Sequence, residues 1–157
     1  MPTCSGTATI VRKANGDPIS STLQCPAADG CPPDAGPEGK RSCVQVKSTF
    51  AAGPKNKDHL ETEILFCACL TKEEAEKAAT DPGGISFPSD CALQLKNVYR
   101  ITDGVSTLIR ADAYCGGSCP KDGDKCPAKP TPTVNKSEDG TTITEVYNCN
   151  CAAKAPQ

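Results

Sequence analysis

The sequence contains very few of the large side chains that normally fill a protein core. It has no Trp, three Phe, three Tyr and one Met, and hydrophobic residues, cysteine included, make up 37% of its 157 residues. No apolar stretch approaches the roughly 18 residues that a membrane-spanning helix needs. A small core stabilises a domain only marginally, so we expect covalent cross-links to supply the missing stability.

The chain also lacks an excess of charge of one sign. It has 17 basic and 19 acidic residues and a net charge of −2, with no long run of Lys or Arg. A phosphate backbone is bound through clustered positive charge, so nucleic acid is excluded as an expected partner. Residues 1–4 show no apolar signal segment, which fits either a cytosolic protein or the mature form of a secreted one.

Cysteine, in contrast, is abundant, and its spacing repeats. Two sets of six each end in a Cys-x-Cys pair within similar segments, Glu63–Cys69 and Glu145–Cys151. This recurrence indicates an internal duplication with a first repeat (1–70), a linker with a short helix (71–90) and a second repeat (91–157). The predicted disulfide-forming residues are Cys4, Cys25, Cys31, Cys43, Cys67, Cys69, Cys91, Cys115, Cys119, Cys126, Cys149 and Cys151.

An even number of cysteines, divided evenly between repeats, favours disulfides and therefore a secreted, periplasmic or cell-surface protein. Each Cys-x-Cys pair could alternatively be a redox centre or a pair of zinc ligands. The zinc spacing is missing from the first repeat, and every cysteine belongs to a matched framework. We therefore predict that the two members of each pair form bridges to different cysteines of their own repeat.

The pattern of side chains predicts a mainly β, disulfide-rich fold of two tandem antiparallel repeats with about four strands each. Asn15-Gly16 and Asp103-Gly104 are typical of tight hairpin turns between β-rich segments. The third strand of the second repeat is rich in Pro, which places it at a sheet edge. The only predicted helix lies at 71–80, where Thr71 and Glu74 form a capping box.

Residues with catalytic or metal-binding chemistry are sparse. His59, the only histidine, is predicted to be an exposed side chain at the lip of a hairpin. Glu63 and Glu145 recur at equivalent, solvent-facing positions, where cross-strand ion pairs are expected rather than an acid-base pair. We therefore predict a protein that is not an enzyme and binds no cofactor and no metal.

Two further motifs remain open. Aspartates 122 and 124 resemble part of a calcium loop, as do aspartates 29 and 34, but neither set has the full ligand spacing. Asn135-Lys136-Ser137 is a glycosylation sequon on an expected exposed loop, which is meaningful in a eukaryotic source.

The candidate binding residues lie in two loops rich in Pro and Gly. Lys40, Arg41 and Ser42 precede the fourth cysteine of the first repeat, and Lys125 has the equivalent place in the second. Inhibitors of trypsin-like proteases present a basic residue on such a rigid loop, because preorganisation lowers the entropic cost of binding. An alternative interpretation is an ordinary solvent-exposed loop, in which the same basic residues have no binding role.

The sequence therefore predicts a non-catalytic, secreted or cell-surface binding protein. Its exposed Pro/Gly-rich loops would engage a protein or a glycan, without nucleic acid and without a membrane span. The first alternative is a serine-protease inhibitor, and the second is an intracellular Cys-rich zinc or redox protein. The oligomeric state is left open.

Overall fold

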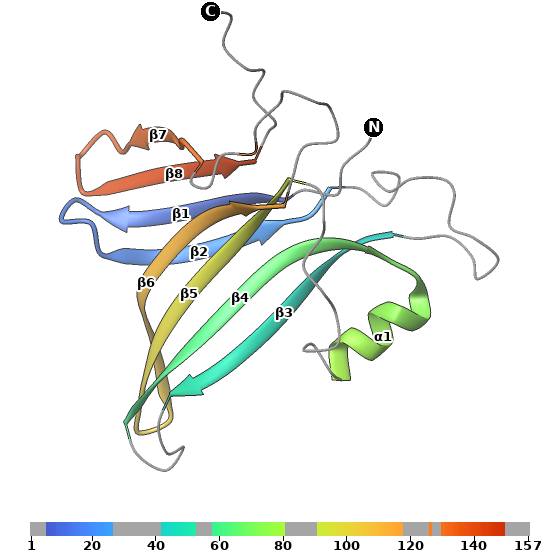
Figure 1. The fold of residues 1–157 in the computed structure, drawn as a ribbon. Helices are drawn as coiled ribbons and strands as arrows, with labels where there is room; N and C mark the ends of the chain where they lie inside the picture. Colours follow the sequence, from blue (N-terminus) through green and yellow to red (C-terminus); the bar gives the residue numbers. More distant parts are fainter. Residues whose placement is uncertain are drawn as a thin grey trace, which may run out of the picture.

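The computed structural model describes residues 6–26, 42–52, 58–80, 91–117, 126 and 130–149. Within them the chain forms eight strands and one helix (Figure 1). In chain order these are β1 (Thr7–Lys13), β2 (Pro18–Gln24), β3 (Ser42–Ala52), β4 (His59–Leu70), α1 (Lys72–Thr80), β5 (Ala92–Thr102), β6 (Val105–Gly116), β7 (Thr133–Lys136) and β8 (Thr142–Asn148).

The predicted fold class is confirmed: the protein is mainly β, with two four-stranded antiparallel sheets and one short helix. The two predicted hairpin turns form where the chain reverses between β1 and β2 and between β5 and β6. Gly16 and Gly104 have φ angles of 97° and 77° there. A side chain at this φ would clash with its own backbone, which explains why glycine is found in both turns.

Each sheet combines one hairpin from each repeat. Sheet A has the strand order β2-β1-β8-β7, and sheet B has the order β3-β4-β5-β6. The division into 1–70, 71–90 and 91–157 describes the duplication of the sequence, and the sheets do not follow it. In Figure 1 the blue strands of the first repeat lie beside the red strands of the second.

The two sheets are related to one another as the two repeats are. The strands β1, β2, β3 and β4 of the first repeat correspond to β5, β6, β7 and β8 of the second. When each strand is exchanged for its counterpart, the order of sheet A becomes β6-β5-β4-β3, which is the order of sheet B read from its other edge. The registers agree as well: Ile10 lies opposite Glu145 in sheet A, and at the equivalent positions Asn97 lies opposite Glu63 in sheet B. The pairings β1–β2 and β5–β6 also contain a register shift at the same place. The fold therefore has an internal two-fold relationship, and in these pairings it is preserved residue by residue.

The main core lies between the sheets, where β2 also lies against β6. Small and sulfur-containing side chains make up much of it, as expected for a chain with few aromatic residues. Its buried members are Ala8, Ile10, Leu23, Leu65, Cys67, Cys91, Leu93, Leu95, Ala111, Ala113, Tyr147 and Cys149.

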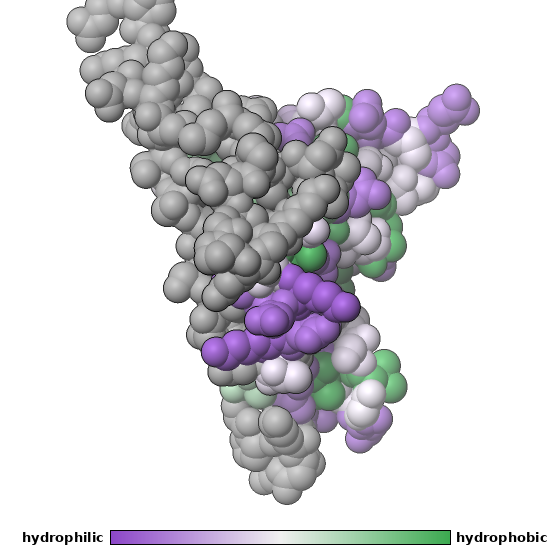
Figure 2. Space-filling view, turned by 90° about the vertical axis from the view of Figure 1, so that its right-hand side faces the viewer, coloured by the Kyte–Doolittle hydropathy of each residue, from purple (hydrophilic) through white to green (hydrophobic). Residues whose placement is uncertain are grey.

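A second, smaller core lies on the other face of sheet B, beneath α1. It contains Val46, Phe66, Ala68, Leu70 and Ala78, with Phe66 only 5% exposed. The helix thus covers apolar strand positions with its own small residues, as an amphipathic surface helix does. Its opposite side forms the hydrophilic band in the middle of Figure 2.

The predicted capping box of α1 is confirmed. The Thr71 hydroxyl accepts a hydrogen bond from the backbone N–H of Glu74 (3.2 Å), and the Glu74 carboxylate accepts one from the N–H of Thr71 (3.0 Å). Two backbone donors that have no partner within the helix are satisfied in this way. Thr71 is thus the single residue between the end of β4 at Leu70 and the start of α1 at Lys72.

The proline-rich counterpart of β3 also behaves as predicted. β7 begins at Thr133, after Pro130 and Pro132, and all four of its residues are exposed at the edge of sheet A. Asp139 orders the turn from β7 to β8 by accepting hydrogen bonds from the Ser137 hydroxyl (2.5 Å) and the backbone N–H of Thr141 (3.1 Å).

Candidate functional site

Two equivalent disulfides connect the sheets. Cys25, directly after β2 in sheet A, is bonded to Cys67 in β4 of sheet B. Cys115, in β6 of sheet B, is bonded to Cys149, directly after β8 in sheet A. Both bonds join the second and fifth cysteines of one repeat and have a Cα–Cα distance of 5.7 Å. Each of these disulfides lies at the strand end from which one of the two Pro/Gly-rich loops starts.

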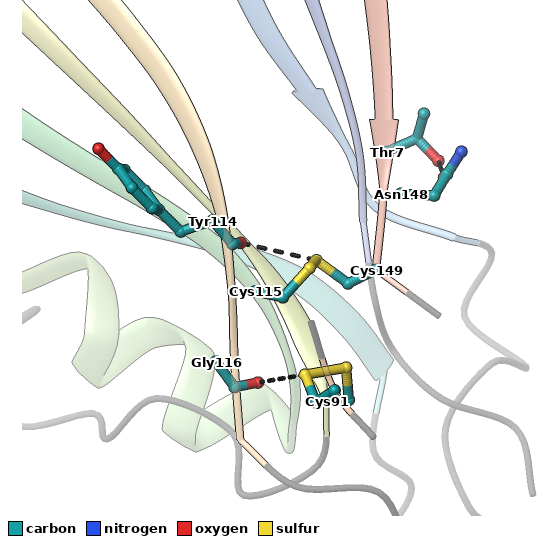
Figure 3. The surroundings of a disulfide bond; sticks show 8 residues. Thr7, Cys91, Tyr114, Cys115, Gly116, Asn148 and Cys149 are labelled. Atoms are coloured by element: carbon teal, nitrogen blue, oxygen red, sulfur yellow. Dashed lines mark hydrogen bonds between the residues drawn. A yellow bond between two sulfur atoms is a disulfide. The ribbon is translucent and has the colours of Figure 1, made fainter. Parts of the chain in front are cut away.

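The second repeat has a further disulfide beside the first. Cys91, just before β5, is bonded to Cys126, and the Cys126 sulfur lies 3.7 Å from the carbonyl oxygen of Gly116 (Figure 3). A disulfide sulfur carries no hydrogen, so this approach is a packing contact rather than a hydrogen bond. Both ends of the loop from Gly116 to Cys126 are thus tied to the same group of strand ends.

The first repeat has the matching cluster. The sulfur atoms of Cys25, Cys43 and Cys67 lie within 4.8 Å of one another. Three thiolates at this distance could hold a metal ion, but all three cysteines are disulfide-bonded. Ser42 begins β3 next to Cys43, so the loop that starts after Cys25 returns to the same cluster.

We call these two clusters the loop anchors. The first loop anchor consists of Cys25, Cys43 and Cys67, and the second of Cys91, Cys115, Cys126 and Cys149. All eight cysteines in the described part of the chain, including Cys69, are disulfide-bonded. The prediction that the members of a Cys-x-Cys pair do not bond to each other is confirmed, since Cys67 pairs with Cys25 and Cys149 with Cys115. The predicted disulfide cysteines 4, 31, 119 and 151 lie outside the described residues.

Of the predicted binding residues, the structure describes only Ser42. It is half-buried as the first residue of β3 and pairs with Leu70 of β4. Lys40, Arg41 and Lys125 lie outside the described residues, as do the four aspartates of the possible calcium loops. Their assignment as binding residues stays a prediction.

The expected cross-strand ion pairs of the two recurring glutamates are confirmed. Glu145 accepts a hydrogen bond from Arg12 Nε at 2.6 Å, and Lys47 Nζ lies 3.5 Å from Glu63 Oε2. The prediction that both glutamates face solvent is wrong: the Glu63 and Glu145 side chains are only 17% and 19% exposed. Both lie on the inner sheet faces, since strand residues two positions apart point the same way and Leu65 and Tyr147 belong to the core.

The Arg12 guanidinium connects the two sheets. Besides Glu145, it donates a hydrogen bond from Nη2 to the carbonyl oxygen of Ala111 in β6 (2.7 Å). Burial lowers the pKa of Arg12, but the hydrogen bond and charge of Glu145 outweigh that effect and raise the pKa above its ordinary value. Arg12 therefore stays charged and neutralises Glu145.

Tyrosine hydroxyls complete the two glutamate clusters. Tyr147 donates to Glu145 Oε1 (3.0 Å), and Tyr99 lies 3.5 Å from Glu63 Oε1. Burial and then the neighbouring carboxylate raise the pKa of both tyrosines, because each disfavours the phenolate. Each glutamate is thus held by a cation and a phenol, an arrangement that stabilises charge and contains no nucleophile.

The prediction that His59 is exposed is also wrong. His59 is 8% exposed, and its Nε2 lies 3.2 Å from Glu61 Oε1. The reason is that β4 begins at His59, opposite Ile101 of β5, so the residue lies in the sheet rather than in the preceding loop. A shallow groove of about 520 Å³ beside it is also lined by Asp58 and Arg100.

A second groove, of about 400 Å³, runs between β3 and α1 and was missed by sequence reasoning. Val44 and Val46 line it from the strand, and Ala75 and Ala78 from the helix. The sequence signal for it was the alanine stripe of the helix, because such small side chains leave space between a helix and a sheet.

The only helix in the described residues, α1, is too short to cross a membrane. No protein-family model, no curated protein and no solved structure matches this chain.

Proposed function

We propose that this protein is a non-catalytic, secreted or cell-surface binding protein that engages a protein or glycan partner through its two Pro/Gly-rich loops. The observation that carries the proposal is the pair of loop anchors. Disulfides hold the strand ends from which both loops leave, so the loops start from fixed positions. A loop held in this way loses less conformational entropy when it binds a partner.

The surrounding chemistry supports binding rather than catalysis. In the described part of the chain, the two recurring glutamates are neutralised by Arg12 and Lys47, and His59 is buried beside Glu61. A general acid or base must reach a substrate and requires a matching nucleophile or second proton carrier. Among the described residues His59 and Glu61 do come together, but His59 is only 8% exposed and is poorly placed to reach a substrate.

The oxidised cysteines support an extracellular setting. Disulfides persist in secreted, periplasmic and surface proteins, whereas cytosolic thiols are kept reduced. An intracellular zinc or redox protein would need thiolates, and all eight described cysteines are in disulfides. Alkylation of the native protein before and after chelation tests this point, because a zinc protein would become reactive only once the metal is removed.

The binding proposal is tested with loop replacements that keep every cysteine. In one variant residues 32–41 become a Gly/Ser sequence of equal length, and in another residues 120–125 do. Wild type and variants are compared on an array of immobilised oligosaccharides and a panel of extracellular proteins at micromolar concentration. We expect ligands of the wild type to be lost in at least one variant with unchanged thermal stability. A wild type without ligands, or ligands retained after both replacements, would overturn the proposal.

One observation favours the serine-protease inhibitor as a second candidate. Ser42 is paired in β3 beside the disulfide-bonded Cys43, so the basic residues 40 and 41 directly precede a rigid anchor. Titration of trypsin activity with the intact protein tests this function. The double variant Lys40→Ala, Arg41→Ala should abolish inhibition, while Lys125→Ala separates the contribution of the second loop.

A further inference from the structure

Strand β3 forms an open edge of sheet B. In the described part of the chain the two sheets have four edge strands, of which β2 and β6 lie against each other. The other two are β3 and its counterpart β7. β7 has four residues and follows Pro130 and Pro132, and a short edge preceded by proline resists the addition of another strand. β3 has 11 residues and no proline, so a long row of backbone groups stays open along it.

The backbone of β3 can form a second set of hydrogen bonds. Among the described residues, β3 pairs with β4 alone. In an antiparallel pair, every second residue of an edge strand directs its N–H and C=O groups away from the partner strand. Between Val44 and Phe50 these groups form a regular row, with the spacing that the backbone of another extended chain matches. An edge of this kind binds its partner through main-chain hydrogen bonds.

The groove between β3 and α1 runs along the same edge. Its volume is about 400 Å³, and the residues of β3 that line it lie between Val44 and Thr49. Figure 1 shows α1 beside this outer strand. Val46 and Ala78 are buried in the small core beneath the helix, whereas Val44 and Ala75 are only partly buried against it. The small core is therefore open towards the edge of β3, where the side chains of an added strand would extend it.

We propose that the β3 edge binds an extended segment of another protein, which adds a strand to sheet B. Side chains alternate along a strand, so every second side chain of the segment would lie on the same face as Val46 and pack against Ala75. Aliphatic side chains and alanines line the groove on this face, which favours Val, Ile or Leu in the segment. The inference does not rest on the proposed function, which assigns binding to the two Pro/Gly-rich loops.

The other face of the edge is polar. Gln45, Lys47 and Thr49 are all exposed there. Lys47 Nζ lies 3.5 Å from Glu63 Oε2 of β4, and the Lys47 side chain is 59% exposed. A carboxylate of the segment would lie on the side of Lys47 opposite Glu63, so that negative, positive and negative side chains alternate across three strands. The ligand is therefore an extended peptide in which aliphatic and polar residues alternate and one polar residue is acidic.

The probe is a set of synthetic peptides of about seven residues, enough to span the edge from Val44 to Phe50. Val, Ile or Leu alternates in them with Thr, and one Thr is replaced by Glu. Binding to the full-length protein is measured by fluorescence polarisation at protein concentrations up to about 1 mM. We expect saturable binding by at least one peptide, and weaker binding when Lys replaces its Glu.

Methylation of the peptide backbone distinguishes strand addition from simple apolar contact. In an added strand, alternate N–H groups face β3 and the others face solvent. Two versions of the binding peptide are made, with N-methyl groups on one alternate set of amides or on the other. One version should lose affinity by about tenfold or more, because its main-chain hydrogen bonds to β3 are removed, and the other should bind nearly as well as the parent.

A pair of helix variants tests the groove. Ala75→Leu fills it from the side of α1 and should weaken peptide binding by about tenfold. Thr80→Leu is the matched control, at an exposed position of the same helix that does not line the groove. Leucine is a good helix former, so both variants should keep the circular dichroism spectrum of the wild type.

Three results would overturn the proposal. The first is that no peptide of the set binds, and the second is that both methylated versions lose or keep affinity equally. The third is that Ala75→Leu, folded like the wild type, binds the peptide as tightly as Thr80→Leu does. The methylation result needs no change to the protein, so it decides the question even if a helix variant fails to fold.

Discussion

Sheets A and B share one backbone plan but differ in what covers them. Helix α1 packs on the outer face of sheet B, where Phe66 and Ala68 are buried. At the place of Phe66, sheet A has Asn148, which is exposed. The outer faces of the duplicated strands thus diverged according to whether a helix covers them. The type of residue at a strand position depends on what packs over that position as much as on its place in the repeat.

The inner faces differ in a second way. Asn97 and Ile10 occupy equivalent positions and are both fully buried, but only Asn97 is polar. Its Nδ2 donates to Glu63 at 3.3 Å, whereas the equivalent glutamate of sheet A, Glu145, is held by Arg12. Each sheet therefore satisfies the same buried glutamate with different partners.

The largest expected effect tests the difference between the outer faces. Phe66→Ala removes a buried ring from beneath α1 and should lower the free energy of unfolding by about 4 kcal/mol. The matched variant Asn148→Ala should lower it by less than about 1 kcal/mol, because its side chain is exposed. Urea unfolding followed by circular dichroism measures both. Equal losses would show that α1 does not protect a core on sheet B.

A pair of exchanges at the inner face sharpens the second difference. Ile10→Asn places an amide in the core of sheet A opposite Glu145, whose carboxylate is already bonded to Arg12 and Tyr147, and should cost roughly 3 kcal/mol. Asn97→Ile should change the free energy of unfolding by less than about 1 kcal/mol, since it removes a polar group together with one long hydrogen bond. Urea unfolding of both variants measures the two changes in the free energy of unfolding. A larger loss for Asn97→Ile would mean that the buried amide is essential to its sheet.

The disulfides test how far the two repeats are equivalent. Cys25→Ala with Cys67→Ala, and Cys115→Ala with Cys149→Ala, should each lower the free energy of unfolding by about 3 kcal/mol. The closed segments span 42 and 34 residues, so the entropic contributions differ by only a few tenths of a kcal/mol. Guanidinium unfolding of the two double variants should give losses that agree within about 1 kcal/mol. A clear inequality would show that one loop anchor carries more of the fold than the other.

The two glutamates should differ in their contribution to stability. Glu145→Gln weakens a short, largely buried ion pair that also involves Tyr147, and should cost about 2 kcal/mol. Glu63→Gln should cost less than about 1 kcal/mol, because its cation, Lys47, is 59% exposed and screened by solvent. A double-mutant cycle of Glu145→Gln with Arg12→Ala measures the coupling. Coupling near zero would contradict the role assigned to Arg12.

The smallest effect concerns the turn at the free edge of sheet A. Hydrogen bonds from Ser137 and Thr141 lower the pKa of Asp139 from its ordinary value of 3.8 to about 2. A lowered pKa in the folded state stabilises the protein above about pH 4, and this contribution is lost as the pH falls towards 2. NMR titration of the Asp139 carboxyl group should give a midpoint near pH 2, and Asp139→Asn should reduce the acid sensitivity over this range. A midpoint near 4 would mean that the turn is open in solution.

Much of the local structure followed from the sequence for identifiable reasons. The Asn-Gly and Asp-Gly pairs predicted both tight turns, the prolines placed β7 at an edge, and Thr71 with Glu74 predicted the start of α1. Each of these signals acts between residues close in the chain. The errors at His59 and at the two glutamates had a common cause. Polarity does not by itself indicate exposure, because a polar side chain can be buried when it finds a partner, in the same strand for His59 and in other strands for the two glutamates.

The sequence alone determined the duplication into two six-cysteine repeats and the alternation of inner and outer residues within each strand, and it predicted the disulfides in which the eight described cysteines take part. Only the tertiary structure decided that β1 pairs with β8 and β4 with β5, so that each sheet is shared between the repeats. The physical reason is that alternation specifies which face of a strand is buried but not which strand lies beside it. That choice depends on contacts between residues far apart in the chain, such as Arg12 with Glu145 and Ala111, which no local pattern encodes.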